Sequence, residues 1–120
     1  MDYTAFVRKA KEQDSRNIFE AYTGNLDVVP NELKPFYRAC NPVDVELDIN
    51  DAVVRFCPAV ELPEMQQEYS YINAQFVFAT SNGDPIFLRE GTVYTCAHGM
   101  KEPKWEKLSD SFERYIDAVQ

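Results

Sequence analysis

The sequence is poor in the residues that enzymes and metal centres use most. Among its 120 residues it has one histidine, three cysteines and four glycines. The cysteines, Cys40, Cys57 and Cys96, are odd in number and widely spaced, and the chain does not begin with a basic and then apolar leader. Because secreted disulfide frameworks need paired cysteines behind such a leader, we expect free thiols and a cytoplasmic protein.

Long apolar runs are also missing from the sequence. No stretch approaches the roughly 18 consecutive apolar residues that cross a bilayer, so no membrane span is expected. Basic residues are the minority, because 12 Lys and Arg stand against 20 Asp and Glu, which gives a net charge of −8. Such a surface repels nucleic acids and anionic membranes, whereas it attracts a basic protein partner. The alternative is that the charge only keeps a small protein dispersed.

The chain does contain enough apolar material for one domain. Hydrophobic residues make up 45% of it, including 8 Phe and 7 Tyr, and this length suits a single core. We predict one domain over residues 1–120. Its predicted fold class is α+β, with a central, mostly antiparallel sheet of about five strands flanked by N- and C-terminal helices.

Helices are predicted in the first third of the chain and at its end. Apolar residues recur at helical spacing in two stripes about three turns apart, which predicts a helix over residues 2–22, although Asp14 could cap a second helix instead. Residues 30–40 open with proline and predict a short helix. Residues 61–72 fit either a short helix or an ordered loop. A broad apolar stripe predicts a last helix over residues 105–119.

Alternating apolar and polar residues predict the strands. Asn82 and Gly83 form the strongest short hairpin signal, because both residues tolerate a positive φ. Asp84 beside them is expected to fix the turn through its side chain. The same residues lack the glycine spacing and the lysine of a phosphate-binding loop. The predicted strands are residues 45–49, 54–57, 76–80, 86–88 and 92–96.

Acidic residues gather on the first of these strands and its turn. Alternation places Asp44, Glu46 and Asp48 on one face, and Asp51 follows in the turn. One interpretation is a docking surface for a basic protein, with Tyr71 as a further interface anchor because tyrosines are common in hot spots. The alternative is a solvated face whose charge protects a sheet edge. A calcium loop would need another spacing and a central glycine, so no metal site is predicted.

The lone histidine allows one catalytic hypothesis. His98 lies two residues after Cys96, so on a strand both side chains point the same way, as a Cys–His nucleophile or half a zinc site would need. Zinc would need two more ligands, and the other cysteines lack the C-x-x-C spacing. The alternative is that Cys96 is a small buried hydrophobe and that His98 caps a turn. We predict no enzyme activity, no catalytic residue and no cofactor.

Four segments, taken in order, resemble a known family. They are VPNELKPFYRACNP (29–42), ATSNGDPIFL (79–88), GTVYTCAHG (91–99) and KLSDSFERYIDAV (107–119). In the SUKH superfamily a proline-led helix likewise ends at an asparagine, and a Gly-Asp turn separates two strands. A Val-Tyr strand and a final helix with a Ser-Phe start follow. The superfamily includes bacterial immunity proteins and relatives of the yeast cell-wall-synthesis regulator, and the resemblance is carried by the order of the motifs.

The resemblance implies an α+β fold and a binding function with no catalytic residue set. Bacterial members typically neutralise a cognate toxin, often a nuclease or deaminase, by docking on it, and nucleases are usually basic. The family's Gly-Asp pair falls on Gly83 and Asp84, where a structural turn is expected. Two alternatives stay open: a small ligand-binding or enzymatic domain that uses His98 and Cys96, and a regulatory scaffold without a toxin partner.

Overall fold

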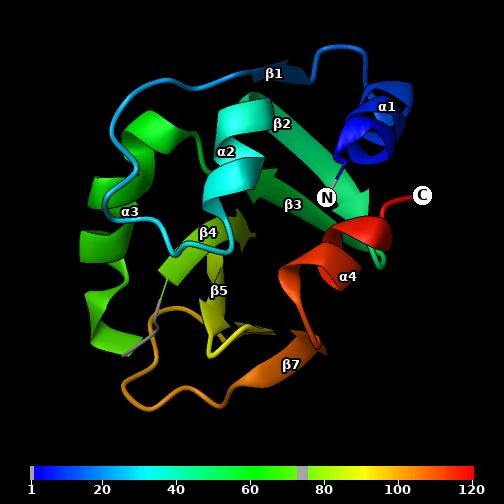
Figure 1. The fold of residues 1–120 in the computed structure, drawn as a ribbon. Helices are drawn as coiled ribbons and strands as arrows, with labels where there is room; N and C mark the ends of the chain where they lie inside the picture. Colours follow the sequence, from blue (N-terminus) through cyan, green and yellow to red (C-terminus); the bar gives the residue numbers. More distant parts are fainter. Residues whose placement is uncertain (1, 73–75) are drawn as a thin grey trace.

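The computed structural model describes residues 2–72 and 76–120, which fold as an α+β protein (Figure 1), so the predicted class is confirmed. None of the described helices is both long and apolar enough to span a bilayer. The strands are β1 (Ile18–Glu20), β2 (Asn41–Ile49), β3 (Ala52–Phe56), β4 (Phe76–Ser81), β5 (Asp84–Arg89), β6 (Thr92–Thr95) and β7 (Glu106–Ser109). The helices are α1 (Thr4–Gln13), α2 (Lys34–Cys40), α3 (Leu62–Glu68) and α4 (Phe112–Asp117), and the 3₁₀ turns are η1 (Ala59–Glu61) and η2 (Ser70–Ile72).

The described strands form one seven-stranded antiparallel sheet, in which each strand pairs with its neighbours along the chain. The prediction of about five strands was too low, because β1 and β7 lie where helices were expected. Two predicted turns are confirmed. Asn50 and Asp51 have φ values of 51° and 67°, and Asn82 and Gly83 have 51° and 85°, which is the conformation that tight hairpins need.

The N-terminal helix is shorter than the predicted range of 2–22. α1 ends at Gln13, and the second apolar stripe forms β1. Asp14 leaves the helical region with φ −153° and ψ 115°, and its Oδ1 accepts a hydrogen bond from the Arg16 N–H at 2.9 Å. The break at Asp14 is therefore real, but a strand follows it. Ile18 of β1 pairs with Asp44 of β2, a contact between distant segments that helical spacing cannot reveal.

The predicted last helix over 105–119 is also wrong in its first half. β7 pairs with β6, and α4 begins only after Ser111, whose Oγ accepts a hydrogen bond from the Arg114 N–H at 3.1 Å. Trp105 lies before β7 and packs edge-on against Phe87 of β5, with ring centroids 5.0 Å apart. The residues of the predicted apolar stripe are thus divided between β7 with the segment before it and a helix of six residues, α4.

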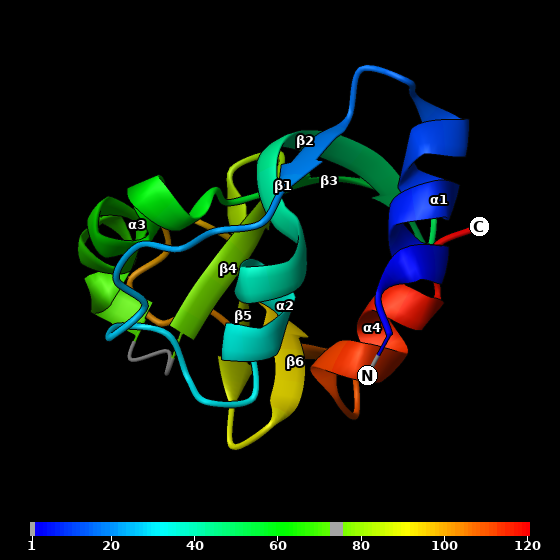
Figure 2. The ribbon, with the colours of Figure 1, turned by 45° about the horizontal axis from the view of Figure 1, so that its top comes forward.

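An aromatic cluster joins three helices to one face of the sheet. Phe36 of α2 lies at its centre, with ring centroids 5.8 Å from Phe6 of α1 and 5.0 Å from Phe112 of α4. On the sheet side Phe36 lies 6.2 Å from Phe56, and Phe112 lies 5.2 Å from Phe78. Figure 2 shows α2 in front of the sheet, α1 and α4 together at one side, and α3 at the other.

Segment 61–72, which the sequence left open, holds α3 between the 3₁₀ turns η1 and η2. The short helix predicted over 30–40 is present as α2, but it begins at Lys34 instead of Pro30 and has Pro35 in its first turn. β2 begins directly at Asn41, so Asn41 and Pro42 end this helix as expected. The two larger errors concern the ends of the chain, although α1 and α4 still contribute Phe6 and Phe112 to the core.

Candidate partner-binding surface

The three carboxylates Asp44, Glu46 and Asp48, called the acidic row below, lie on one face of β2, as predicted. All three residues are exposed, whereas Val45 and Leu47 between them are only 1% and 3% exposed. This alternation follows from strand geometry, since successive side chains point to opposite faces. The buried valine and leucine therefore fix which way the carboxylates point.

Two side-chain amides hold the outer edge of β2 beyond the short strand β1. The Glu46 N–H donates to Oδ1 of Asn17 at 2.9 Å, and the Asp48 N–H donates to Oε1 of Gln13 at 2.7 Å. Nε2 of Gln13 in turn donates to the carbonyls of Asp48 at 3.0 Å and Gln120 at 3.1 Å. These amides take the place of a neighbouring strand. The acidic row therefore stands on a backbone that is hydrogen-bonded at both edges.

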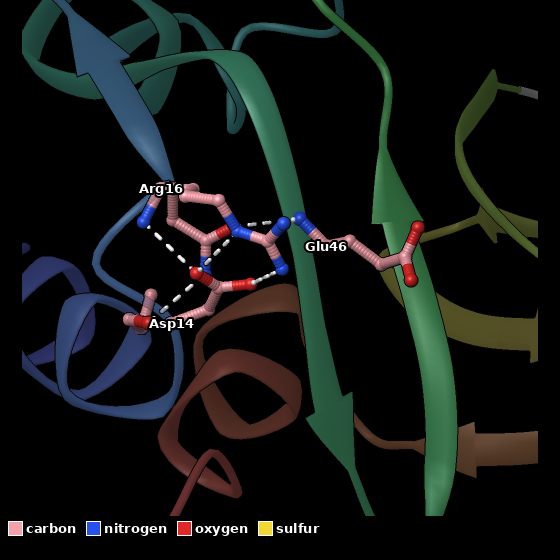
Figure 3. Close-up of polar contacts among 5 residues, drawn as sticks. Asp14, Arg16 and Glu46 are labelled. Atoms are coloured by element: carbon pink, nitrogen blue, oxygen red, sulfur yellow. Dashed lines mark hydrogen bonds and ion pairs between the residues drawn. The ribbon is translucent and has the colours of Figure 1, made fainter.

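An ion pair between Arg16 and Asp14 lies beside the acidic row, and Arg16 attracts the row without forming an ion pair with it in the described residues. Arg16 Nη2 lies 2.9 Å from Asp14 Oδ2, and its Nε donates to Asp14 Oδ1 at 3.1 Å. These hydrogen bonds lower the pKa of Asp14 and raise the pKa of Arg16, which the charges of Asp44 and Glu46 raise further. In Figure 3 the Glu46 carboxylate points away from this pair, toward β3.

The neighbouring strand β3 extends the exposed face. Arg55 pairs with Glu46 across the two strands, but its Nη2 lies 3.6 Å from Oε2 of Glu61 instead. Val53 is 47% exposed, and Asp51 is exposed in the turn. In the described part of the chain, no hydrogen bond or ion pair engages the carboxylates of the acidic row or of Asp51. The surface therefore presents carboxylates without ion-pair partners among the described residues, next to exposed apolar side chains such as Val53 and Ile18.

Tyr71, the predicted further anchor, lies elsewhere. It is 49% exposed on η2, where its ring centroid lies 6.3 Å from that of Tyr69. η2 follows α3, which lies on the opposite side of the ribbon from the β2–β3 turn in both views (Figures 1 and 2). The structure therefore does not bring Tyr71 to the acidic row, because the end of α3 and the β2–β3 hairpin lie on opposite sides of the fold.

The hairpin turn holds a pair that sequence reasoning missed. Asp84 Oδ1 accepts hydrogen bonds from the His98 N–H at 2.9 Å and lies 2.7 Å from Nδ1 of His98. Thr95 pairs with Ile86, so continuing this register by three residues brings His98 beside Gly83. Extending the register of the β5–β6 hairpin past Thr95 would have placed His98 close to Asp84. Asp84 thus fixes the loop after β6 rather than its own turn.

The pKa of Asp84 reflects two opposing effects. Burial raises this pKa. The hydrogen bonds from the His98 side chain and backbone, together with the His98 charge, lower it by a larger amount, so the net shift is downward. A Cβ on Gly83 would lie 3.2 Å from Cε1 of His98, and φ there is +85°. Glycine at this turn therefore serves both the backbone conformation and the close approach of the imidazole.

The cysteines do not form a site with the histidine. All three are buried free thiols. Burial raises the pKa of Cys40 and of Cys57 to about 12, and it also raises the pKa of Cys96. Nucleophilic and metal-binding cysteines need the thiolate form, which burial disfavours here. No group of three or more His, Cys, Asp or Glu side chains suited to a metal ion occurs in the residues that the structure describes.

Comparisons with protein-family models, with curated proteins and with solved structures found no match to this chain. Its family and function are therefore inferred from its own residues. The acidic row, with its unpaired carboxylates on a fixed strand, is the feature best suited to recognition of another molecule.

Proposed function

We propose that this chain is a non-catalytic binding protein of the SUKH superfamily, an immunity protein that neutralises a basic toxin by docking on it. The segments that resemble the family lie on α2, on the β4–β5 hairpin, on β6 and on the end of the chain that carries α4. Their order along the chain, together with an α+β fold, supports the family proposal. The net charge of −8 supports a basic partner.

The unpaired acidic row is the observation that carries the proposal. Some described carboxylates, such as those of the half-buried Asp14 and the exposed Asp110, form ion pairs with arginine or lysine. Asp44, Glu46 and Asp48 have no such partner in the described residues. Like charges that lie close together on one face of a sheet repel one another. A cationic surface that covers the three carboxylates offsets this repulsion, which favours binding. Such complementarity increases association rates and selects the partner.

Co-expression tests the proposal. We expect a gene for a toxic domain beside this chain's gene. That domain is produced in a bacterial host, with and without this chain, and growth is measured. We expect the native chain to restore growth and the variant D44N/E46Q/D48N to restore it less, with weaker binding in titration calorimetry. The matched control E64Q/E68Q/E102Q removes three exposed carboxylates elsewhere and is expected to protect like the native chain.

Two results would contradict the proposal. Unchanged protection and affinity in the acidic-row variant would show that docking uses another surface. The absence of a neighbouring toxin gene would favour the regulatory scaffold.

Binding of the toxin is also expected to weaken as salt rises from 50 to 500 mM, because salt screens the attraction between exposed charges. The affinity of the acidic-row variant should depend less on salt than the affinity of the control.

A further inference from the structure

A pocket of about 250 Å³ opens at the end of the sheet, away from the acidic row. It lies between the β2–β3 turn, the β4–β5 hairpin, β7 and α4. Its floor is apolar and its mouth is polar, with two carboxylates, Asp84 and Glu106. Ile49, Asn50, Ser81, Ile86 and Leu108 are among the other residues that line it.

Strand register explains why the two carboxylates share this pocket. Ile86 of β5 pairs with Thr95 of β6, and Thr95 pairs with Glu106 of β7. Residues directly opposite each other on antiparallel strands share a face of the sheet. Asp84 lies two residues before Ile86 and therefore also on that face. The two carboxylates thus stand on either side of β6, above the apolar floor.

One carboxylate is held in place and the other is open to solvent. The Asp84 Oδ1 atom accepts a hydrogen bond from the His98 backbone N–H and lies within hydrogen-bond distance of Nδ1 of the His98 ring. Oδ2 of Asp84 has no hydrogen bond among the described residues. Glu106 is exposed and its carboxylate forms no ion pair in the described part of the chain. The mouth therefore offers acceptors to a cation, while the floor offers contact to an aliphatic stem.

We propose that this pocket receives a lysine or arginine side chain of the basic partner, with the stem on Ile49, Ile86 and Leu108 and the cationic group between Asp84 and Glu106. The identity of the partner rests on the proposed function. Long basic side chains commonly bury their stems while the charged end stays at the surface. The pocket is smaller than the roughly 300–1,000 Å³ of drug-sized ligand sites, so its size fits a single side chain.

Binding of n-butylammonium to the full chain tests the pocket without any partner. In ¹H–¹⁵N spectra we expect saturable shifts at the amides of Asn50, Ser81 and Glu106. The variant E106Q should weaken the affinity for n-butylammonium roughly threefold, as the loss of a part-exposed ion pair does. Methylammonium, which lacks the stem, and n-butanol, which lacks the charge, should each bind more weakly than n-butylammonium.

Two controls make the result specific. E102Q removes an exposed carboxylate outside the pocket and should leave n-butylammonium binding unchanged. D44N/E46Q/D48N should also leave it unchanged while weakening binding of the toxin. Absence of saturable shifts at the pocket, or equal affinity in E106Q and the native chain, would overturn the inference.

The partner experiment separates this inference from the proposed function. E106Q should weaken toxin binding, and E102Q should not. If toxin binding is lost in the acidic-row variant but is unchanged in E106Q, the proposed function stands and the pocket inference fails. If no toxin binds the native chain, the proposed function fails, and the shifts with n-butylammonium still report whether the pocket accepts an alkyl cation.

Discussion

At the scale of the residue, burial makes the thiols poor candidates for a Cys–His nucleophile. Cys96 is 3% exposed and Cys57 is 0% exposed, and burial raises the pKa of both. A thiol that stays protonated and covered is a poor nucleophile. His98, the residue proposed as its partner from the sequence, is hydrogen-bonded to Asp84 instead.

We therefore predict that the folded chain resists thiol-labelling reagents. In an Ellman assay at about pH 8, close to the pKa of an ordinary cysteine, the native protein should react far more slowly than the same protein in guanidinium chloride. In the denatured protein three thiols per chain should react. Rapid native labelling at Cys96, identified by mass spectrometry, would instead support the enzymatic alternative.

The Asp84–His98 pair makes stability depend on pH in a defined direction. Because the folded pKa of Asp84 is lower than its ordinary value of 3.8, the carboxylate contributes stability above that value. The contribution decreases as the pH falls through the lower folded pKa. We predict that the difference in unfolding free energy between the native chain and D84N is constant from about pH 5 to 6 and shrinks below about pH 4. Urea titrations check this, and a difference that grows on acidification would contradict it.

At the scale of the element, glutamine side chains complete the strands where pairing stops. β3 pairs with β4 only at Thr80 and Ala79. Farther along β4, Gln66 of α3 accepts a hydrogen bond from the Val77 N–H at 2.8 Å and donates to the Val77 carbonyl at 2.7 Å. Gln13 does the same for Asp48 of β2. Both helices are thereby tied to the sheet by backbone-like hydrogen bonds.

Neighbouring glutamines on α3 provide a matched test. Gln66→Ala leaves the Val77 N–H and carbonyl without partners and should lower the free energy of unfolding by about 1–3 kcal/mol. Gln67 is exposed, so Gln67→Ala should change it by less than about 0.5 kcal/mol. Urea denaturation measures both, and hydrogen exchange at the Val77 amide should accelerate in the first variant only. Equal effects of the two substitutions would show that the hydrogen bonds to Val77 contribute nothing.

At the scale of the whole molecule, charge is expected to serve binding rather than folding. The acidic row supplies three of the excess negative charges of a chain whose net charge is −8, and it forms no ion pair within the described residues. Self-repulsion of a highly charged chain disfavours the compact state. The carboxylates should therefore be neutral or slightly unfavourable for the fold.

We predict that D44N/E46Q/D48N unfolds at the same urea concentration as the native chain, or at a slightly higher one, with a free-energy change within about 0.5 kcal/mol. The control E64Q/E68Q/E102Q removes the same charge from other exposed sites and should behave alike. A loss of more than about 1 kcal/mol in the acidic-row variant alone would show that these carboxylates support the fold.

Much of the sheet could be predicted because its signals are local. Asn82 and Gly83 favour a tight turn by their own backbone preferences, and Val45 and Leu47 place the acidic row by alternation. The ends of the chain could not be predicted in this way. Ile18 belongs to a strand because it pairs with Asp44, far along the chain. The helical spacing of the apolar residues around Ile18 does not indicate that partner.

The sequence by itself determined the fold class, the hairpin turns, the helix that carries Phe36 and the outward direction of Asp44, Glu46 and Asp48, because propensity and periodicity act over a few residues. Only the tertiary structure decided that residues 105–119 divide into a strand and a helix and that Tyr71 stands apart from the acidic row. Each of these depends on contacts between segments distant in the sequence, whose free energy exceeds the local preference.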